Sequence, residues 1–164
     1  GTIALLFAKP ISLWELLLGK FIGIFFLVLC SLFGSFIYVY AILQLKLELD
    51  VFDWGVFWGS FIGLVFLSSV FISITLLSSC LFKNQVIAFL AAVLLCFLHY
   101  YGWSELSLYF SDNTLYGFVN SIGIRSHYNQ LSKGIIESKD LVYFLGQLFL
   151  FLNIAVIQLK KIKQ

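Results

Sequence analysis

"FWGSFIGLVFLSSVFISITLLSSCLF" fills residues 57–82 without a single charged side chain. An α-helix of that length rises about 39 Å, more than the roughly 30 Å of a bilayer's hydrocarbon core. Three further apolar stretches are also long enough to cross a membrane, which gives predicted spans at 21–45, 57–82, 86–103 and 141–159. The sequence therefore predicts an all-α integral membrane protein whose residues 1–164 form one transmembrane domain with four spans.

The composition supports a membrane protein and excludes an ordinary soluble domain. Hydrophobic residues make up 62% of the chain and charged residues 11%, and the mean hydropathy is +1.04. Soluble domains contain far more charge. Because the sequence starts with Gly1 and contains no methionine, we expect it to be a piece of a longer protein.

The distribution of cations predicts how the spans are oriented. One side of the membrane would carry Lys9, Lys20, Lys83, Lys160, Lys161 and Lys163, and the other Lys46, Arg125, Lys133 and Lys139. Cytoplasmic loops carry the excess of Lys and Arg. Both ends of this chain are therefore predicted to be cytoplasmic, and the segment 104–140 to lie outside.

The outer segment 104–140 contains helix signals and many apolar residues. Its candidate N-caps, together with that of the last span, are Asp112, Asn113, Ser126 and Ser138. The first helix would end near Gly123 and the second near Gly134. The segment is too apolar for an open loop, so it should fold back onto the membrane, either as an extracytoplasmic gate or as an amphipathic surface element.

A stripe of small residues marks one face of the span 57–82. Gly55, Gly59 and Gly63 recur every four residues, and small residues let membrane helices approach closely. Gly19 and Gly23 repeat this spacing at the start of the first span. Packing within one chain is the favoured interpretation of the stripe, and a seam between two copies is the alternative.

The same span is rich in hydroxyl groups. Ser69 and Ser73 are candidates for a translocation path. Serine in a membrane helix more commonly bonds to its own backbone, so both interpretations stay open.

No catalytic or metal site can be recognised. Gly19 and Lys20 form the only Gly-Lys pair, but Trp14 and Phe21 stand where a phosphate-binding loop needs Gly and Ser or Thr. Neither His99 nor His127 has a second metal ligand within a helical turn, so both are interpreted as boundary residues. All acidic residues fall at or outside span boundaries, which argues against ion-coupled secondary transport.

The first twenty residues, "GTIALLFAKPISLWELLLGK", predict a broken helix. Thr2 can cap a short helix over residues 2–9, Pro10 ends it, and Ser12 with Glu15 forms a capping box for the next helix. The short helix could lie on the lipid surface or dock a cytoplasmic partner.

This opening resembles the "GT(I/L)ELLLT(K/S)P(I/V)S…GK" signature of type 2 ABC transporter (ABC-2) permeases, with Ala4 in place of the usual glutamate. There it forms the coupling helix, which implies ATPase-coupling roles for Thr2, Leu5, Leu6, Lys9 and Pro10. Residues 81–102 and 125–146 are similar to the gliding-motility-associated ABC transporter permease.

The resemblance implies the C-terminal part of a six-span permease in the bacterial inner (cytoplasmic) membrane. Its partners would be the lipid bilayer, a cytoplasmic ABC ATPase and a second permease copy or paralogue, with no nucleic acid. No cofactor is expected in this chain, because ATP and magnesium would be bound by the ATPase. The expected function is ATP-driven export; the alternative is a membrane scaffold of a motility or secretion complex that translocates nothing.

Overall fold

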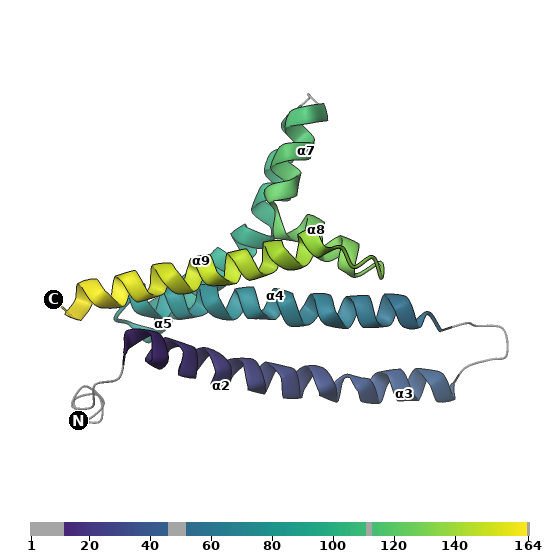
Figure 1. The fold of residues 1–164 in the computed structure, drawn as a ribbon, viewed down its shortest axis with the longest axis horizontal. Coiled ribbons are helices and arrows are strands. Elements are labelled where there is room, and N and C mark those ends of the chain that lie inside the picture. The colour runs from purple at the N-terminus through teal and green to yellow at the C-terminus, as the bar shows by residue number, and fades with distance from the viewer. Residues whose placement is uncertain (1–11, 46–51, 111–112, 164) are drawn as a thin grey trace.

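The computed structural model describes residues 12–45, 52–110 and 113–163, and the regular elements within these ranges are helical (Figure 1). Four helical stretches are long and apolar enough to cross a membrane: Leu13–Gln44, Trp54–Leu81, Gln85–Ser107 and Ser138–Lys161. The predicted all-α fold with four candidate transmembrane helices is confirmed. The coupling helix predicted over 2–9 lies outside the described residues.

The first candidate span consists of α2 (Leu13–Gly34) and α3 (Phe36–Gln44). Ser12 begins it with the predicted capping box: the Ser12 amide donates to Glu15 Oε2 at 2.9 Å, and the Glu15 amide donates to Ser12 Oγ at 3.2 Å. The helix is interrupted at Ser35, whose hydroxyl donates to the Leu32 carbonyl at 2.6 Å. A hydroxyl that bonds to the preceding turn bends a helix, a feature that apolar length alone does not reveal.

The next two helices, α4 (Trp54–Leu81) and α5 (Gln85–Phe97), form a hairpin with a short connection. The Asp53 carboxylate caps α4 by accepting hydrogen bonds from the amides of Gly55 and Val56. The Asn84 side chain caps α5 by accepting one from the Val86 amide. After α5 the chain forms a π-helical segment, η1 (Leu98–Gly102), and the short helix α6 (Trp103–Ser107).

Two helices connect α6 to the last span. In Figure 1, α7 (Asn113–Ile122) points steeply away from the bundle, whereas α8 (Ile124–Leu131) lies against it, beside the start of α9 (Ser138–Lys163).

The expected capping roles of Ser126 and Ser138 are wrong. Gly123 is the N-cap of α8, and the Ser126 hydroxyl donates back to the Gly123 carbonyl at 2.7 Å. Ser126 already lies in the first turn, so its side chain reaches a carbonyl instead of a free amide. Ser138 is likewise already the first residue of α9. Glu137 directly precedes the helix, and its carbonyl accepts a hydrogen bond from the Asp140 amide at 3.1 Å.

Helix α4 is the central element and packs against α2, α5, α8 and α9. Two buried apolar clusters lie along it. The α2 cluster consists of Leu17, Ile72, Leu76, Leu77, Leu152, Ala155 and Val156. The α8 cluster consists of Leu67, Val70, Ile74, Ile124, Leu131 and Phe144. Each cluster joins α4 and α9 to a third helix, α2 in one case and α8 in the other.

Candidate functional site

The glycine face of α4 is covered by α8 and the turn that follows it. A Cβ atom added to Gly59 would overlap the Leu131 carbonyl oxygen and lie 2.7 Å from Gly134 Cα. At Gly63 an added Cβ would lie 3.2 Å from Leu131 Cβ and 3.3 Å from the Tyr128 ring. Glycine therefore lets α8 approach the backbone of α4 more closely than any side chain would permit.

A glycine in the turn after α8 faces the glycines of α4 and makes the close contact possible from that side. Gly134 has a φ of +79° and ends α8 in a Schellman-type turn, in which the Ile135 amide donates to the Gln130 carbonyl at 3.2 Å. A Cβ on Gly134 would lie 3.0 Å from the Gly55 carbonyl carbon. Close by, the Ser60 hydroxyl donates to the Ser132 carbonyl at 3.1 Å.

The structure thus places the glycine stripe against α8 of the same chain, and not against another membrane-spanning helix. Gly19 and Gly23 differ, because nothing in the described part of the chain lies within 4 Å of a Cβ built on either. The expectation of a close helix approach at these two residues is not met among the described residues.

A buried hydrogen-bonded pair, His127 and Asp140, joins α8 to α9. His127 Nδ1 lies 2.6 Å from Asp140 Oδ1, and His127 Nε2 lies 2.8 Å from the Ser121 carbonyl oxygen. A carbonyl only accepts, so Nε2 carries a proton, and a second proton lies between Nδ1 and the carboxyl group. The Asp140 side chain is fully buried and that of His127 is 13% exposed. Asp140 also lies in the first turn of α9, where the helix dipole favours a negative charge.

Tyr143 holds the α7–α8 junction onto the same pair. Its ring stacks on the His127 imidazole with centroids 3.9 Å apart, and its hydroxyl donates to the Ile122 carbonyl. On the other side of α8, Arg125 lies 3.6 Å from Glu105 and 5.2 Å above the Tyr101 ring. We call α8 and the turn through Gly134 the docked segment; it is fixed to α4 by backbone contact and to α9 by polar contacts.

The sequence interpretation treated His127 and Asp140 as unrelated boundary residues and missed their pairing. One signal could have revealed it, because the two residues lie seven positions before and six positions after Gly134. An antiparallel helical hairpin that turns at Gly134 brings such equidistant residues together.

The translocation-path candidates Ser69 and Ser73 are buried inside the bundle. Ser69 Oγ donates to the Phe66 carbonyl and Ser73 Oγ to the Val70 carbonyl, each at 2.6 Å. Both hydroxyls are therefore bonded to their own helix.

The remaining candidates can be placed only in part. The coupling residues Thr2, Leu5, Leu6, Lys9 and Pro10 lie outside the described ranges. Within those ranges, no group of three or more His, Cys, Asp or Glu side chains could hold a metal ion.

Comparison with known proteins gives one family. No curated protein and no solved structure matches the chain. The family described as ABC-2 family transporter protein matches residues 1–161. With four apolar helices and a match over almost its whole length, the chain belongs to the ABC-2 transporter family.

Proposed function

We propose that the chain is the permease part of an ATP-driven exporter and that a separate ATPase drives it through residues 2–9. Family membership supports a transmembrane transporter subunit. The proposal adds that ATP and magnesium are bound by the partner, that a second permease copy or paralogue completes the transporter, and that transport is outward.

The observation that carries this proposal is the position of α4 between two different contacts. The residues proposed to bind the ATPase directly precede α2, and α2 inserts Leu17 into the α2 cluster with α4 and α9. Further along, the same two helices hold α8. Packed interfaces of this kind shift between discrete arrangements and do not deform continuously. A displacement of α2 can therefore be transmitted through α4 and α9 to the docked segment.

Residues 104–140 would act as the gate in this proposal. Ser69 and Ser73 lie beside the α8 cluster in the chain, and both are buried, so a path along them would require a neighbouring helix to move away from α4. The proposal extends to motility-related export, which rests on the resemblance of residues 81–102 and 125–146 noted in the sequence.

The orientation can be tested by cysteine labelling. Lys83 lies between α4 and α5, and Lys133 lies between α8 and α9. We propose that the α4–α5 connection faces the cytoplasm of a bacterial inner membrane, so single cysteines at 83 and 133 should react from opposite sides. Labelling of both from the same side would refute the proposed topology.

The decisive experiment for function replaces Leu6 by Asp in the full-length protein. Burying a leucine is worth roughly 1.5–3 kcal/mol, and a buried charge adds a further penalty. Copurification with the ATPase should therefore weaken at least about tenfold while the membrane level is unchanged.

Leu45 provides a matched control, because it is 81% exposed at the end of α3 farthest from α2. Leu45→Asp should leave copurification unchanged. Unchanged copurification in Leu6→Asp would contradict a coupling helix. An ATPase that binds normally but whose hydrolysis never responds to a transported substrate would instead favour the membrane scaffold.

A further inference from the structure

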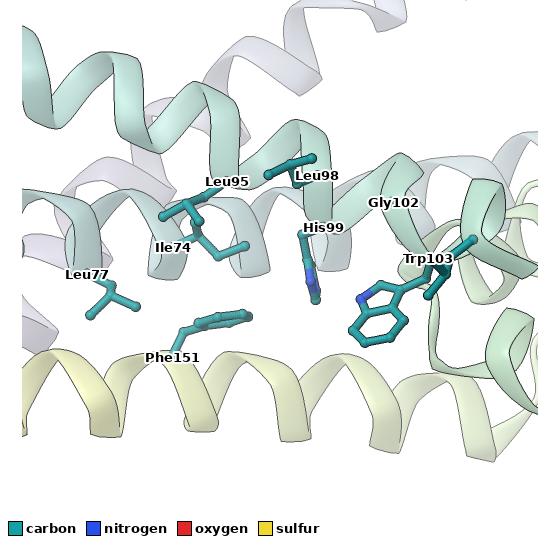
Figure 2. A pocket seen from close by; sticks show the side chains of 9 residues that line it. Ile74, Leu77, Leu95, Leu98, His99, Gly102, Trp103 and Phe151 are labelled. Carbon is teal, nitrogen blue, oxygen red and sulfur yellow. The ribbon is translucent and has the colours of Figure 1, made fainter.

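Helix α6 contributes to two cavities of different chemistry. The first has a volume of about 400 Å³ and mainly apolar walls, such as Leu98 and Phe151 (Figure 2). The second has a volume of about 280 Å³ and lies between α6, α7 and α8. Charged, amide and hydroxyl side chains dominate this polar cavity, whose lining includes Glu105, Tyr116, Asn120, Arg125 and Asn129. The polar cavity therefore offers groups that can recognise a ligand by charge and by hydrogen bonding.

Two opposite charges line the polar cavity and can be reached from solvent. Arg125 Nη1 lies 3.6 Å from Glu105 Oε1, which exceeds the usual hydrogen-bond range of about 2.7–3.2 Å. The two side chains are 38% and 61% exposed. Exposed pairs of this kind contribute little to stability. The N–H donors of the guanidinium and the oxygens of the carboxylate are therefore open to a third partner.

Neighbouring groups orient the guanidinium and add further polar atoms. Arg125 Cζ lies 5.2 Å from the centroid of the Tyr101 ring, a cation–π distance that favours one placement of the charge. The side chains of Asn120 and Asn129 also line the polar cavity, and each amide has both donors and an acceptor. One small space thus combines a positive group, a negative group and two amides.

We infer that the polar cavity binds a small zwitterion, with an ammonium group and an anionic oxygen group on a short linker. The anionic oxygens accept hydrogen bonds from Arg125, and the ammonium group donates to Glu105. A ligand with a single charge is disfavoured, because an anion beside Arg125 is also repelled by Glu105, and a cation beside Glu105 is also repelled by Arg125.

The volume limits the size of the ligand. About 280 Å³ lies just below the roughly 300–1,000 Å³ of pockets that hold drug-sized molecules. A free amino acid and the glycerophosphoethanolamine head group of a membrane lipid both have the required chemistry. The inference does not depend on ATP coupling or on whether the protein exports anything.

The test measures binding of soluble probes to the full-length protein in phosphatidylglycerol nanodiscs, which contain no zwitterionic lipid. Alanine and glycerophosphoethanolamine are the zwitterions. Propionate and ethylamine each keep one charge of alanine, glycerol 3-phosphate and ethanolamine each keep one charge of the head group, and glycerol is neutral. Saturation-transfer NMR gives each dissociation constant. We expect at least one zwitterion to bind saturably, and at least about tenfold more tightly than its singly charged fragments or glycerol.

The two zwitterions distinguish the source of the ligand. Binding of glycerophosphoethanolamine alone, with competition when phosphatidylethanolamine is added to the nanodisc, supports a lipid head group. Binding of alanine alone, without such competition, supports a free amino acid. Binding of both supports a site that recognises only the shared pair of charges.

Two variants should change the charge preference of the cavity. In Glu105→Gln, affinity for the zwitterion should fall at least about tenfold, whereas propionate and glycerol 3-phosphate should bind more tightly than to the original protein, because no carboxylate repels them. Arg125→Gln should weaken the zwitterion equally and favour ethylamine and ethanolamine instead. A purely structural role of the pair would weaken all the probes together and would not exchange the preference.

Glu137→Gln is the matched control, because Glu137 also pairs with a cation on an exposed surface, Lys139 at 2.6 Å, and does not line the polar cavity. It should leave every affinity unchanged. The inference is overturned if neither zwitterion binds saturably, or if a singly charged probe or glycerol binds as tightly as the zwitterion. It is also overturned if Glu105→Gln and Arg125→Gln behave like the control or weaken all the probes together.

Discussion

Helix α4 makes two kinds of contact along its length. At the α2 cluster, interlocking aliphatic side chains such as Leu17 and Leu76 fill the space between helices. At the docked α8 segment the backbones themselves approach, at Gly59 and Gly134, beside the buried pair of His127 and Asp140. Side-chain packing makes the first contact, whereas close backbone approach beside a buried polar pair makes the second.

This difference predicts different tolerance to change. Apolar cores accept substitutions that conserve volume, whereas a backbone contact has no side chain that can rearrange. A buried hydrogen-bonded pair is similarly sensitive, because losing one partner leaves the other buried without a hydrogen bond. A segment held in this way should be either docked or released, because packed interfaces have discrete arrangements.

Loss of the buried carboxylate should have the largest effect. Asp140→Ala removes the partner of His127 from a fully buried position, and breaking a buried pair costs about 3–5 kcal/mol. Thermal unfolding in detergent should show the loss, and Asp140→Asn should restore part of the stability by keeping a hydrogen-bonding group.

Glu137→Ala is the control for this experiment, because Glu137 pairs with Lys139 at 2.6 Å on an exposed surface. Exposed pairs contribute little. Equal losses for Asp140→Ala and Glu137→Ala would show that burial of the pair is unimportant.

The close backbone approach should give the next largest effect. In Gly59→Leu the new side chain would meet the Leu131 carbonyl and Gly134, and overpacking of this kind costs about 1–3 kcal/mol or more. Gly23→Leu makes the same substitution in α2, where nothing lies within 4 Å. It should be neutral or slightly stabilising, since leucine is the better helix former. Similar losses at both positions would remove the packing argument.

A smaller effect is expected in the α2 cluster. Leu76→Met conserves the volume of a side chain that is 6% exposed, so the loss of unfolding free energy should stay below about 1.5 kcal/mol. The comparison of the two contacts fails if this variant unfolds as easily as Gly59→Leu.

The smallest effect should come from a hydroxyl that is bonded to its own helix. Ser73→Ala removes a side chain that donates only to the Val70 carbonyl at 2.6 Å, so the stability change should be under about 1 kcal/mol. A loss of several kcal/mol would show that Ser73 has a further partner.

Local patterns in the sequence revealed much of the fold. Apolar length predicted four membrane-spanning helices, and the spacing of Ser12 and Glu15 predicted the capping box that starts α2. These features depend on residues within one helix or one turn, so the sequence contains all the information that they need.

The contacts between distant residues were harder to predict. The spacing of His127 and Asp140 about Gly134 is the one local signal of their pairing, and it is informative only once α8 is known to turn at Gly134 and bring the two side chains to 2.6 Å. His99 was similarly interpreted as a boundary residue, since its position in an apolar cavity depends on the separation of α5 from α9. The glycine stripe indicated a close approach, but it did not indicate which element would approach.

Disulfide trapping tests the docking of α8 on α4 most directly. A Cβ built on Gly63 lies 3.2 Å from Leu131 Cβ, close to the separation of about 3.5–4.5 Å that a disulfide spans between Cβ atoms. A Gly63→Cys, Leu131→Cys protein in which Cys30, Cys80 and Cys96 are replaced by alanine should therefore crosslink readily in membranes under mild oxidation. Gly63→Cys with Leu115→Cys, near the start of α7 and far from α8 in the chain, should not. Efficient crosslinking of the first pair alone is the predicted result, and failure of that pair to crosslink, or equal reaction of both pairs, would contradict a segment held against α4.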